Sequence, residues 1–168
     1  MPFLLIALMY SEDKILNKAI TELESKFGKI QSRSEEYDFT FTNYYEKEFG
    51  KGLKKIFVAF QKGIASNSLA EIKKFTNDLE KQTSSDGKRL INIDAGYIDE
   101  NSLVMASNKR MSFKEEISDG IYAHRILEFK DGKWHDFHHT FRDYRMEKNK
   151  KFFISVRQTL ENEKAILN

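Results

Sequence analysis

The hydrophobic pattern divides the first part of the chain into two similar units. A continuous apolar run at 3–10 predicts a central strand that is covered on both faces, and 53–60 predicts a second apolar strand. Each run is followed by apolar residues at helical spacing, over 15–27 and over 69–79, which predicts a helix after each strand. Gly28 supplies an end for the first of these helices. We therefore expect a repeated order of strand, helix and strand.

Two further signals refine this part of the chain. Ser68 and Glu71, three residues apart, match a capping box, which predicts the start of the second helix. In 37–42, aromatic and polar residues alternate, which predicts a half-buried strand. The segment 41–52 is polar and aromatic with glycines at its end, and it predicts a loop or a short helix.

The second part of the chain predicts shorter elements. Residues 89–109 predict two short strands joined by a loop, the first at Leu90–Ala95 and ending at Gly96. Residues 111–120 are polar and predict a loop. The Asp131-Gly132 dipeptide between extended runs at 121–129 and 133–137 predicts a β-hairpin. The last segment, 149–167, carries apolar residues at helical spacing and predicts a C-terminal helix that packs on the sheet: Phe152, Val156 and Leu160.

These elements predict an α+β fold in a single domain, 1–168. Two strand–helix–strand units joined by right-handed crossovers give a two-layer sandwich of ferredoxin-like split βαβ halves, with both helices on one face of the sheet. The β-hairpin and the C-terminal helix are additions to that core. The single proline, Pro2, marks no linker.

Composition narrows the functional classes. Hydrophobic residues at 40% and charged residues at 32% are ordinary for a soluble protein. The net charge of +2 gives no global nucleic-acid signature, so any basic surface must be local. The sequence has no cysteine, which excludes disulfides and thiol catalysis and fits a cytoplasmic location. The N-terminal apolar run lacks the charged start of a signal peptide and is too short to span a bilayer, so we predict no membrane association.

Polar side chains stand on one face of the predicted strand Leu90–Ala95. Alternation places Asn92 and Asp94 on the face opposite Ile91 and Ile93. A neutral polar group that is buried without a partner costs about 2–7 kcal/mol, and a charge costs more. The rest of the fold must therefore supply partners or water for these side chains. We predict that the functional site is centred on this strand.

Two other segments carry polar side chains that could reach this strand. Four polar residues share one stripe of the second helix, beside its buried face: Lys73, Thr76, Asn77 and Glu80. The loop at 41–52 combines adjacent tyrosines with a hydroxyl and a carboxylate: Thr42, Tyr44, Tyr45 and Glu48. The helix stripe is either a rim of hydrogen-bond donors and acceptors for a ligand or ordinary polar surface. The tyrosines of the loop either stack on a base or sugar or cover the core with their hydroxyl groups in solvent. The sequence leaves both interpretations open.

Carboxylates provide the candidate chemistry. Asp94 with Glu48 or Glu80 could hold Mg²⁺ or act as a general acid and base. Asp94 and Glu48 are the candidate catalytic residues, and Mg²⁺ is the candidate cofactor. The alternative is that Asp94 only caps the turn at Gly96.

Histidines and arginines gather late in the chain. Four histidines, His124, His135, His138 and His139, suggest a metal site, but adjacent residues of a strand point to opposite faces, which disfavours one shared ion. The polar group that follows could reach a phosphate or form an ordinary surface ion pair: Arg142, Asp143, Tyr144 and Arg145. The sequence contains no P-loop, no G-x-G-x-x-G, no H-E-x-x-H and no G-x-S-x-G pattern.

A series of segments resembles one protein family in the same order. They are FTNYYEKEFGKGLKKIFVAF, LAEIKKFTNDLE, KRLINIDAGYI, LVMASNK, GIYA and a late T-x-x-D-Y-R. On these motifs the chain resembles an uncharacterised bacterial and archaeal family, catalogued as a domain of unknown function, whose members are often labelled GTP-binding proteins. The resemblance spans nearly the whole chain, with Asp94-Ala95-Gly96 where the family has Asp-Pro-Gly. It implies these functional positions: Thr42, Tyr44, Tyr45, Glu48, Lys73, Thr76, Asn77, Glu80, Arg89, Asn92, Asp94, Gly96, Tyr97, Lys109, Asp143, Tyr144 and Arg145.

Two functional hypotheses follow. The first is a binding protein or enzyme for a phosphorylated ligand, a nucleotide or an RNA end, with basic side chains on the phosphate and tyrosines stacked on the ring. The second is a non-catalytic interaction domain, in which the polar residues form an internal network that fixes the fold. A third, an RNA-binding sheet face, is disfavoured by the nearly neutral charge. The sequence favours the first and predicts no oligomeric state.

Overall fold

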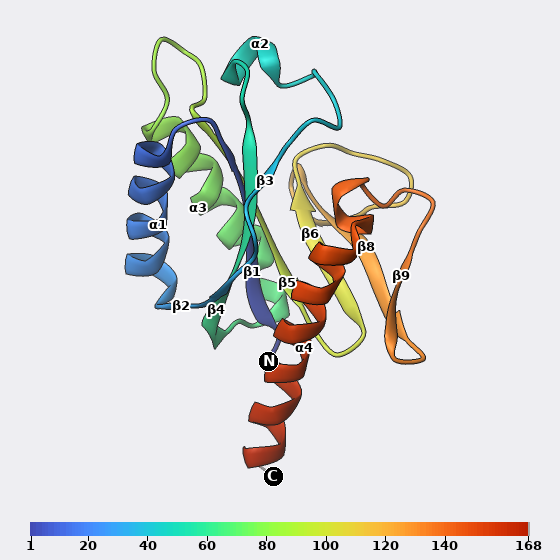
Figure 1. The fold of residues 1–168 in the computed structure, drawn as a ribbon. Coiled ribbons are helices and arrows are strands. Elements are labelled where there is room, and N and C mark those ends of the chain that lie inside the picture. Colours follow the sequence, from blue (N-terminus) through green and yellow to red (C-terminus); the bar gives the residue numbers. More distant parts are fainter. Residues whose placement is uncertain (168) are drawn as a thin grey trace.

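A computed structural model describes residues 1–167 as a mixed α+β protein with a nine-stranded sheet and four α-helices (Figure 1). Neighbouring strands pair antiparallel in the order β2-β4-β1-β5-β6-β8-β7, with β3 also on β4 and β9 also on β8. The elements are β1 (Phe3–Tyr10), α1 (Asp13–Phe27), β2 (Ile30–Arg33), β3 (Tyr37–Asp38), α2 (Glu46–Phe49), β4 (Lys54–Gly63), the 3₁₀ turn η1 (Ser66–Ser68), α3 (Leu69–Gln82), β5 (Ile91–Ile98), β6 (Ser102–Ser107), β7 (Glu115–Ser118), β8 (Ile121–Lys130), β9 (Lys133–Asp136), η2 (Asp143–Arg145) and α4 (Glu147–Leu167).

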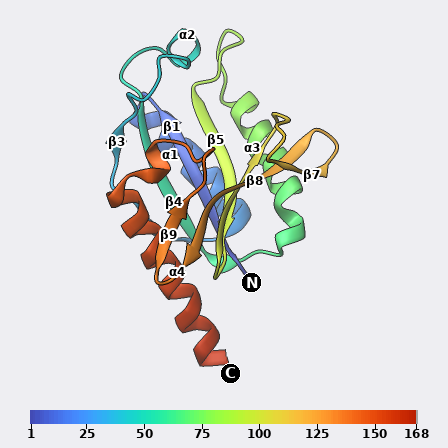
Figure 2. The ribbon, with the colours of Figure 1, turned by 90° about the vertical axis from the view of Figure 1, so that its right-hand side faces the viewer.

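Helices cover both faces of the central strands (Figure 1, Figure 2). On one face α1 and α3 bury an apolar stripe against β1, β4 and β5: Leu16, Ala19, Leu23, Ile72 and Leu79. On the other face α4 packs against the same strands: Phe153, Val156 and Leu160. The two predicted core helices therefore lie on one face as expected, but the two-layer expectation is incomplete because α4 forms a third layer. Strand β1 is buried along its whole length, which explains its continuous apolar run.

The sheet opens between β5 and β6. These strands pair only where Gly96, Tyr97 and Ile98 face Met105, Val104 and Leu103. The preceding part of β5, 91–95, has β1 on one side but no β6 residue on the other. A Cβ atom at Gly96 would lie 2.2 Å from the Val104 carbonyl oxygen, so only glycine permits the close crossing. β5 therefore continues through Gly96, where the sequence predicted its end.

Several predicted details are confirmed. The β8–β9 hairpin turns at Asp131 and Gly132, whose φ angles of 52° and 77° suit a type I′ turn. The first helix ends at Gly28 with a φ of 89°. The short helix predicted in 41–52 is α2. Within residues 1–167, no helix combines the length and the apolar character needed to cross a bilayer.

Other details are corrected. The capping box is absent, because η1 holds Ser68 in a helical conformation and its hydroxyl donates to the Ala65 carbonyl at 2.6 Å. The strand predicted over 37–42 is only Tyr37–Asp38. The Phe39 N–H still donates to the Leu53 carbonyl at 2.8 Å, and the Phe39 ring packs on Phe41 and Tyr45. The loop predicted at 111–120 contains strand β7, which pairs with β8.

Candidate ligand-binding cavity

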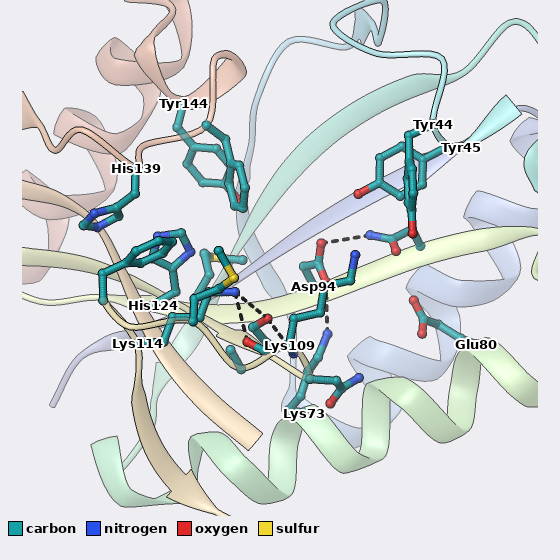
Figure 3. A pocket seen from close by; sticks show the side chains of 18 of the residues that line it. Tyr44, Tyr45, Lys73, Glu80, Asp94, Lys109, Lys114, His124, His139 and Tyr144 are labelled. Atoms are coloured by element: carbon teal, nitrogen blue, oxygen red, sulfur yellow. Dashed lines mark hydrogen bonds and ion pairs between the residues drawn. The ribbon is translucent and has the colours of Figure 1, made fainter. Parts of the chain in front are cut away.

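A cavity of about 400 Å³ occupies the opening between β5 and β6. Its walls come from the approach to α2, from α3, from β5 and the residues just before it, from β6 and β8, from the loop 108–114, and from η2 with the segment before it. The lining residues are Tyr44, Tyr45, Lys73, Glu80, Arg89, Asn92, Asp94, Met105, Ala106, Ser107, Asn108, Lys109, Met111, Phe113, Lys114, His124, His139, Phe141 and Tyr144. Figure 3 shows that His124, His139 and Lys114 lie toward one end, and that Asp94, Glu80 and the two tyrosines lie toward the other.

Asp94 presents its carboxylate to the cavity from β5. Lys73 Nζ, from α3, donates to Asp94 Oδ1 at 3.0 Å, and Asn92 Nδ2 donates to Oδ2 at 2.9 Å. The Lys73 side chain is 4% exposed and that of Asp94 is 38% exposed, so the lysine lies behind the carboxylate. Burial would raise the pKa of Asp94, but the charges of Lys73 and Lys55 and these hydrogen bonds bring it below its usual value. Asp94 is therefore an anion at neutral pH.

This ion pair predicts a pH effect on stability. Because folding lowers the pKa of Asp94, its contribution is present above the unfolded pKa of about 3.9 and is lost as the pH falls through the lower folded value. We expect Asp94→Asn to lower the melting temperature at neutral pH, and the difference from the wild type to shrink in acid. Thermal unfolding followed across pH measures this. Asp78→Asn, an exposed aspartate of α3, is the control that should show no such trend. A difference that persists unchanged in acid would contradict the assignment.

Arg89 joins Glu48 and Glu80, the acidic side chains near the Asp94 end of the cavity. Its guanidinium donates through Nε to the carboxylate of Glu48, and through Nη1 to Glu80 Oε2 at 3.3 Å and Asn92 Oδ1 at 3.0 Å. Glu80 Oε2 also accepts the backbone N–H of Ile93 at 2.7 Å. This N–H belongs to the part of β5 that β6 leaves unpaired, so Glu80 takes the place of a strand partner. Burial raises the pKa of Glu80, against the opposing effects of the Ile93 N–H, Lys73 and Arg89.

Lys109 and Lys114 supply positive charge to the cavity. Lys114 Nζ donates to Ser107 Oγ at 3.0 Å and to the Lys109 carbonyl at 3.2 Å. Lys109 Nζ lies 5.0 Å from the centre of the Tyr44 ring. Neither ammonium forms an ion pair within the described chain, in contrast to Lys73 and Arg89. Burial, followed by the charge of Lys109, lowers the pKa of Lys114.

Aromatic rings surround a buried histidine at the end of the cavity where Lys114 lies. His124 is 2% exposed, and its Nε2 has no hydrogen-bond partner. Its ring centre lies 5.1 Å from that of Phe113, 4.9 Å from that of His139 and 5.3 Å from that of Phe141. Burial lowers the pKa of His124 to about 4, with Lys114 and His139 acting in the same direction. The imidazole is therefore neutral at pH 7.

The residues proposed to bind Mg²⁺ or a histidine-bound metal are not arranged as metal ligands in the described part of the chain. His139 Nε2 lies 3.0 Å from the Arg125 carbonyl oxygen, and Glu48 is bound by Arg89. In residues 1–167, no three His, Cys, Asp or Glu side chains are grouped as metal ligands would be. Glu48 does not line the cavity, so it reaches Asp94 only through Arg89 and Asn92.

The structure brings part of the predicted site together in the cavity: Tyr44, Tyr45, Lys73, Glu80, Arg89, Asn92, Asp94, Lys109 and Tyr144. Thr42, Thr76 and Asn77 lie outside the lining. The Thr42 hydroxyl accepts from the Tyr44 N–H at 3.1 Å, the Thr76 hydroxyl donates to the Lys73 carbonyl at 3.0 Å, and the Asn77 amide pairs with Asn108. These three contacts support the walls.

The remaining predicted residues lie elsewhere. Tyr97 packs in the apolar cluster on the opposite face of β5. Asp143 is buried against Lys55, and Arg145 donates to backbone carbonyls, including that of Thr140 at 3.0 Å.

Sequence reasoning did not place several lining residues in the site. Met111, Phe113 and Lys114 fall in a segment predicted only as a polar loop, and Phe141 lies in another stretch without periodicity. His124 and His139 were conspicuous only as candidate metal ligands. No local pattern marks such residues, because the loops that carry them are positioned by β6 and β8.

The profile of the family described as domain of unknown function (DUF4416) matches residues 2–160. The chain belongs to this family. The prediction of a family of unknown function is thereby confirmed. No curated protein and no solved structure matches the chain, so no named relative supports the GTP-binding label that the resemblance carried.

Proposed function

We propose that the cavity binds a small phosphorylated ligand, for which a nucleotide or a phosphorylated RNA end is the best candidate class. The observation that carries this proposal is the pair Lys109 and Lys114. Within the described chain, the other two cationic side chains of the cavity, Lys73 and Arg89, are paired with carboxylates. The two lysines therefore leave an excess of positive charge in a partly enclosed space, where an anion is favoured.

The remainder of the cavity suits a flat organic group. A volume of about 400 Å³ is within the range of small-molecule sites. Tyr44, Phe113 and Phe141 line the cavity and are 67%, 40% and 51% exposed, so part of each ring is left for a flat group to stack on. Asp94 would accept a hydrogen bond from a ligand hydroxyl or amine, because its exposed carboxylate retains lone pairs beyond those used by Lys73 and Asn92. In this proposal Glu48 positions Arg89.

A specific observation favours the second candidate, a non-catalytic interaction domain. Glu48, Arg89, Asn92, Asp94 and Lys73 form one continuous network that joins α2, β5 and α3. Such a network would fix the fold without any ligand. The two functions differ in what Asp94→Ala changes, since a purely structural network predicts a loss of stability with no effect on ligand binding.

A thermal-shift titration with phosphate, nucleotides and short 5′-phosphorylated RNA tests the proposal. A ligand at about a hundred times its Kd stabilises the protein by about 2.7 kcal/mol. We expect the stabilisation to be lost in the double variant Lys109→Gln, Lys114→Gln. The matched control, Lys18→Gln with Lys151→Gln, alters two exposed lysines on α1 and α4 and should retain it. No stabilisation of the wild type by any of these compounds would favour the interaction domain.

We also infer a ferredoxin-like arrangement for β1 to β5 with α1 and α3. The strand order β2-β4-β1-β5, antiparallel throughout, supports this, as does the position of α1 and α3 on one face. The lack of cysteine supports a cytoplasmic location, as proposed from the sequence.

A further inference from the structure

His124 is a buried titratable group that the proposed function leaves unused. It lies on β8, opposite Met105 of β6, and lines the same end of the cavity as Lys114 (Figure 3). Its Nε2 is closed off from solvent and has no hydrogen-bond partner. Buried polar atoms of folded proteins are nearly always paired, so an unpaired one at a cavity wall is a candidate contact for a bound ligand.

We propose that His124 is a third anion-binding side chain of this cavity, and that its Nε2–H donates to an oxygen of the phosphoryl group held by Lys109 and Lys114, with uptake of a proton on binding. This proposal rests on the proposed function, because it requires an anion at the lysine pair. It adds the identity of a specificity-determining residue and a dependence of binding on pH. It also commits the ligand to a dianionic group, since a charge of that size favours the imidazolium.

The surroundings of His124 explain why the proton is taken up only with the ligand. The titratable groups that face it are Lys114, from the loop before β7, and His139, from the segment after β9. The neighbouring Phe113, Phe141 and Met105 are uncharged. With Lys114 as the nearest charge, burial keeps the empty site's imidazole neutral. A bound dianion reverses the sign of the local field and therefore favours the imidazolium.

The anion needs a path to Nε2. The rings of Phe113 and Phe141 pack on His124, yet they are 40% and 51% exposed. In the proposed complex these rings turn toward solvent and give the anion its path to Nε2. His139 is less free to move, because its ring stacks on Phe113 at 4.2 Å and its Nε2 lies 3.0 Å from the Arg125 carbonyl oxygen.

Sulfate is the sharpest probe, because its double negative charge does not change between acid and neutral pH while that of phosphate does. We expect calorimetric titration of the wild type to show sulfate affinity rising toward about tenfold per pH unit as the pH falls, the limit for uptake of one proton. In His124→Phe the affinity should fall about tenfold, the usual loss for one hydrogen bond to a charged group, and the steep pH dependence should disappear. His135→Gln, in the β8–β9 hairpin and outside the cavity, is the matched control and should behave as the wild type.

An NMR titration of His124 in the wild type tests the same inference without any variant, so it still applies if His124→Phe fails to fold. The NMR resonances of His124 should titrate near pH 4 without sulfate and at clearly higher pH with it. Sulfate that binds with no movement of the His124 titration, or with the same pH dependence in His124→Phe, would overturn this inference and leave the proposed function standing. If protonation of Asp94 alone caused the pH dependence, His124→Phe would show the same pH dependence as the wild type. Failure of the wild type to bind sulfate, phosphate, any nucleotide or 5′-phosphorylated RNA at any pH would overturn both.

Discussion

Replacing Gly96 by alanine is expected to destabilise the protein by about 3 kcal/mol or more, at the upper end of the range for overpacked interiors. The added Cβ would lie 2.2 Å from the Val104 carbonyl oxygen and 3.0 Å from Met105 Cα. Both are backbone atoms of β6, so no side-chain rotation can relieve the overlap. β6 would have to move away from β5 at the only place where the two strands pair. Thermal unfolding should therefore show a melting temperature lower by roughly 10 °C.

Gly63→Ala is the matched control for this substitution. Gly63 also lies in a strand, β4, but its added Cβ would meet the Cβ of Met1 at 3.0 Å, and Met1 is exposed and can shift. We expect a change of at most about 1 kcal/mol there. A Gly96→Ala protein as stable as Gly63→Ala would show that β6 does not cross β5 so closely. Because the same crossing borders the cavity, Gly96→Ala should also abolish the proposed ligand binding in the fraction that remains folded.

Removal of the Asp143 carboxylate is expected to have the second large effect, about 3–5 kcal/mol, the usual result of leaving a buried charge without its partner. Lys55 Nζ lies 2.7 Å from Asp143 Oδ2, with side chains 10% and 4% exposed. The Tyr37 hydroxyl donates to the same oxygen at 2.8 Å. The lysine is otherwise enclosed by aromatic rings, with ring centres at 5.1–5.4 Å: Phe39, Phe57 and Tyr144. Asp143→Ala would therefore leave the buried Lys55 ammonium without its carboxylate partner, among aromatic rings.

A double-mutant cycle separates this explanation from a simple loss of packing. We expect Lys55→Met to be destabilising alone, and Lys55→Met combined with Asp143→Leu to recover most of the loss, because an apolar pair of similar volume needs no solvation. Urea unfolding of the four proteins measures the coupling. Additive losses would show that Lys55 and Asp143 do not interact as an ion pair. The pair joins β4 to η2 and so holds the C-terminal segment, with α4, against the sheet.

Much of the secondary structure could be predicted from the chain because it is encoded locally. The run at 3–10 is apolar throughout since β1 is buried on both faces. The alternation in 91–95 correctly separated Asn92 and Asp94 from the isoleucines, which pack against α1 and α3. The hairpin at Asp131 and Gly132 was predictable because its turn requires positive φ at both residues. Strand β7 escaped prediction, since its four residues are mostly exposed and depend on β8 for pairing.

The sequence by itself determined the α+β class, the membership of a family of unknown function and the polar face of β5. The tertiary structure decided which polar groups meet. Glu48 and Arg89 are 41 residues apart, and Lys55 and Asp143 are 88 apart, so no local periodicity relates them. The close crossing at Gly96 opens the sheet, Glu80 then replaces β6 as the partner of Ile93, and the loop 108–114 brings the lysines to the same space. Electrostatic partners are chosen by proximity in space, whereas hydrophobic periodicity records only which face of each element is buried.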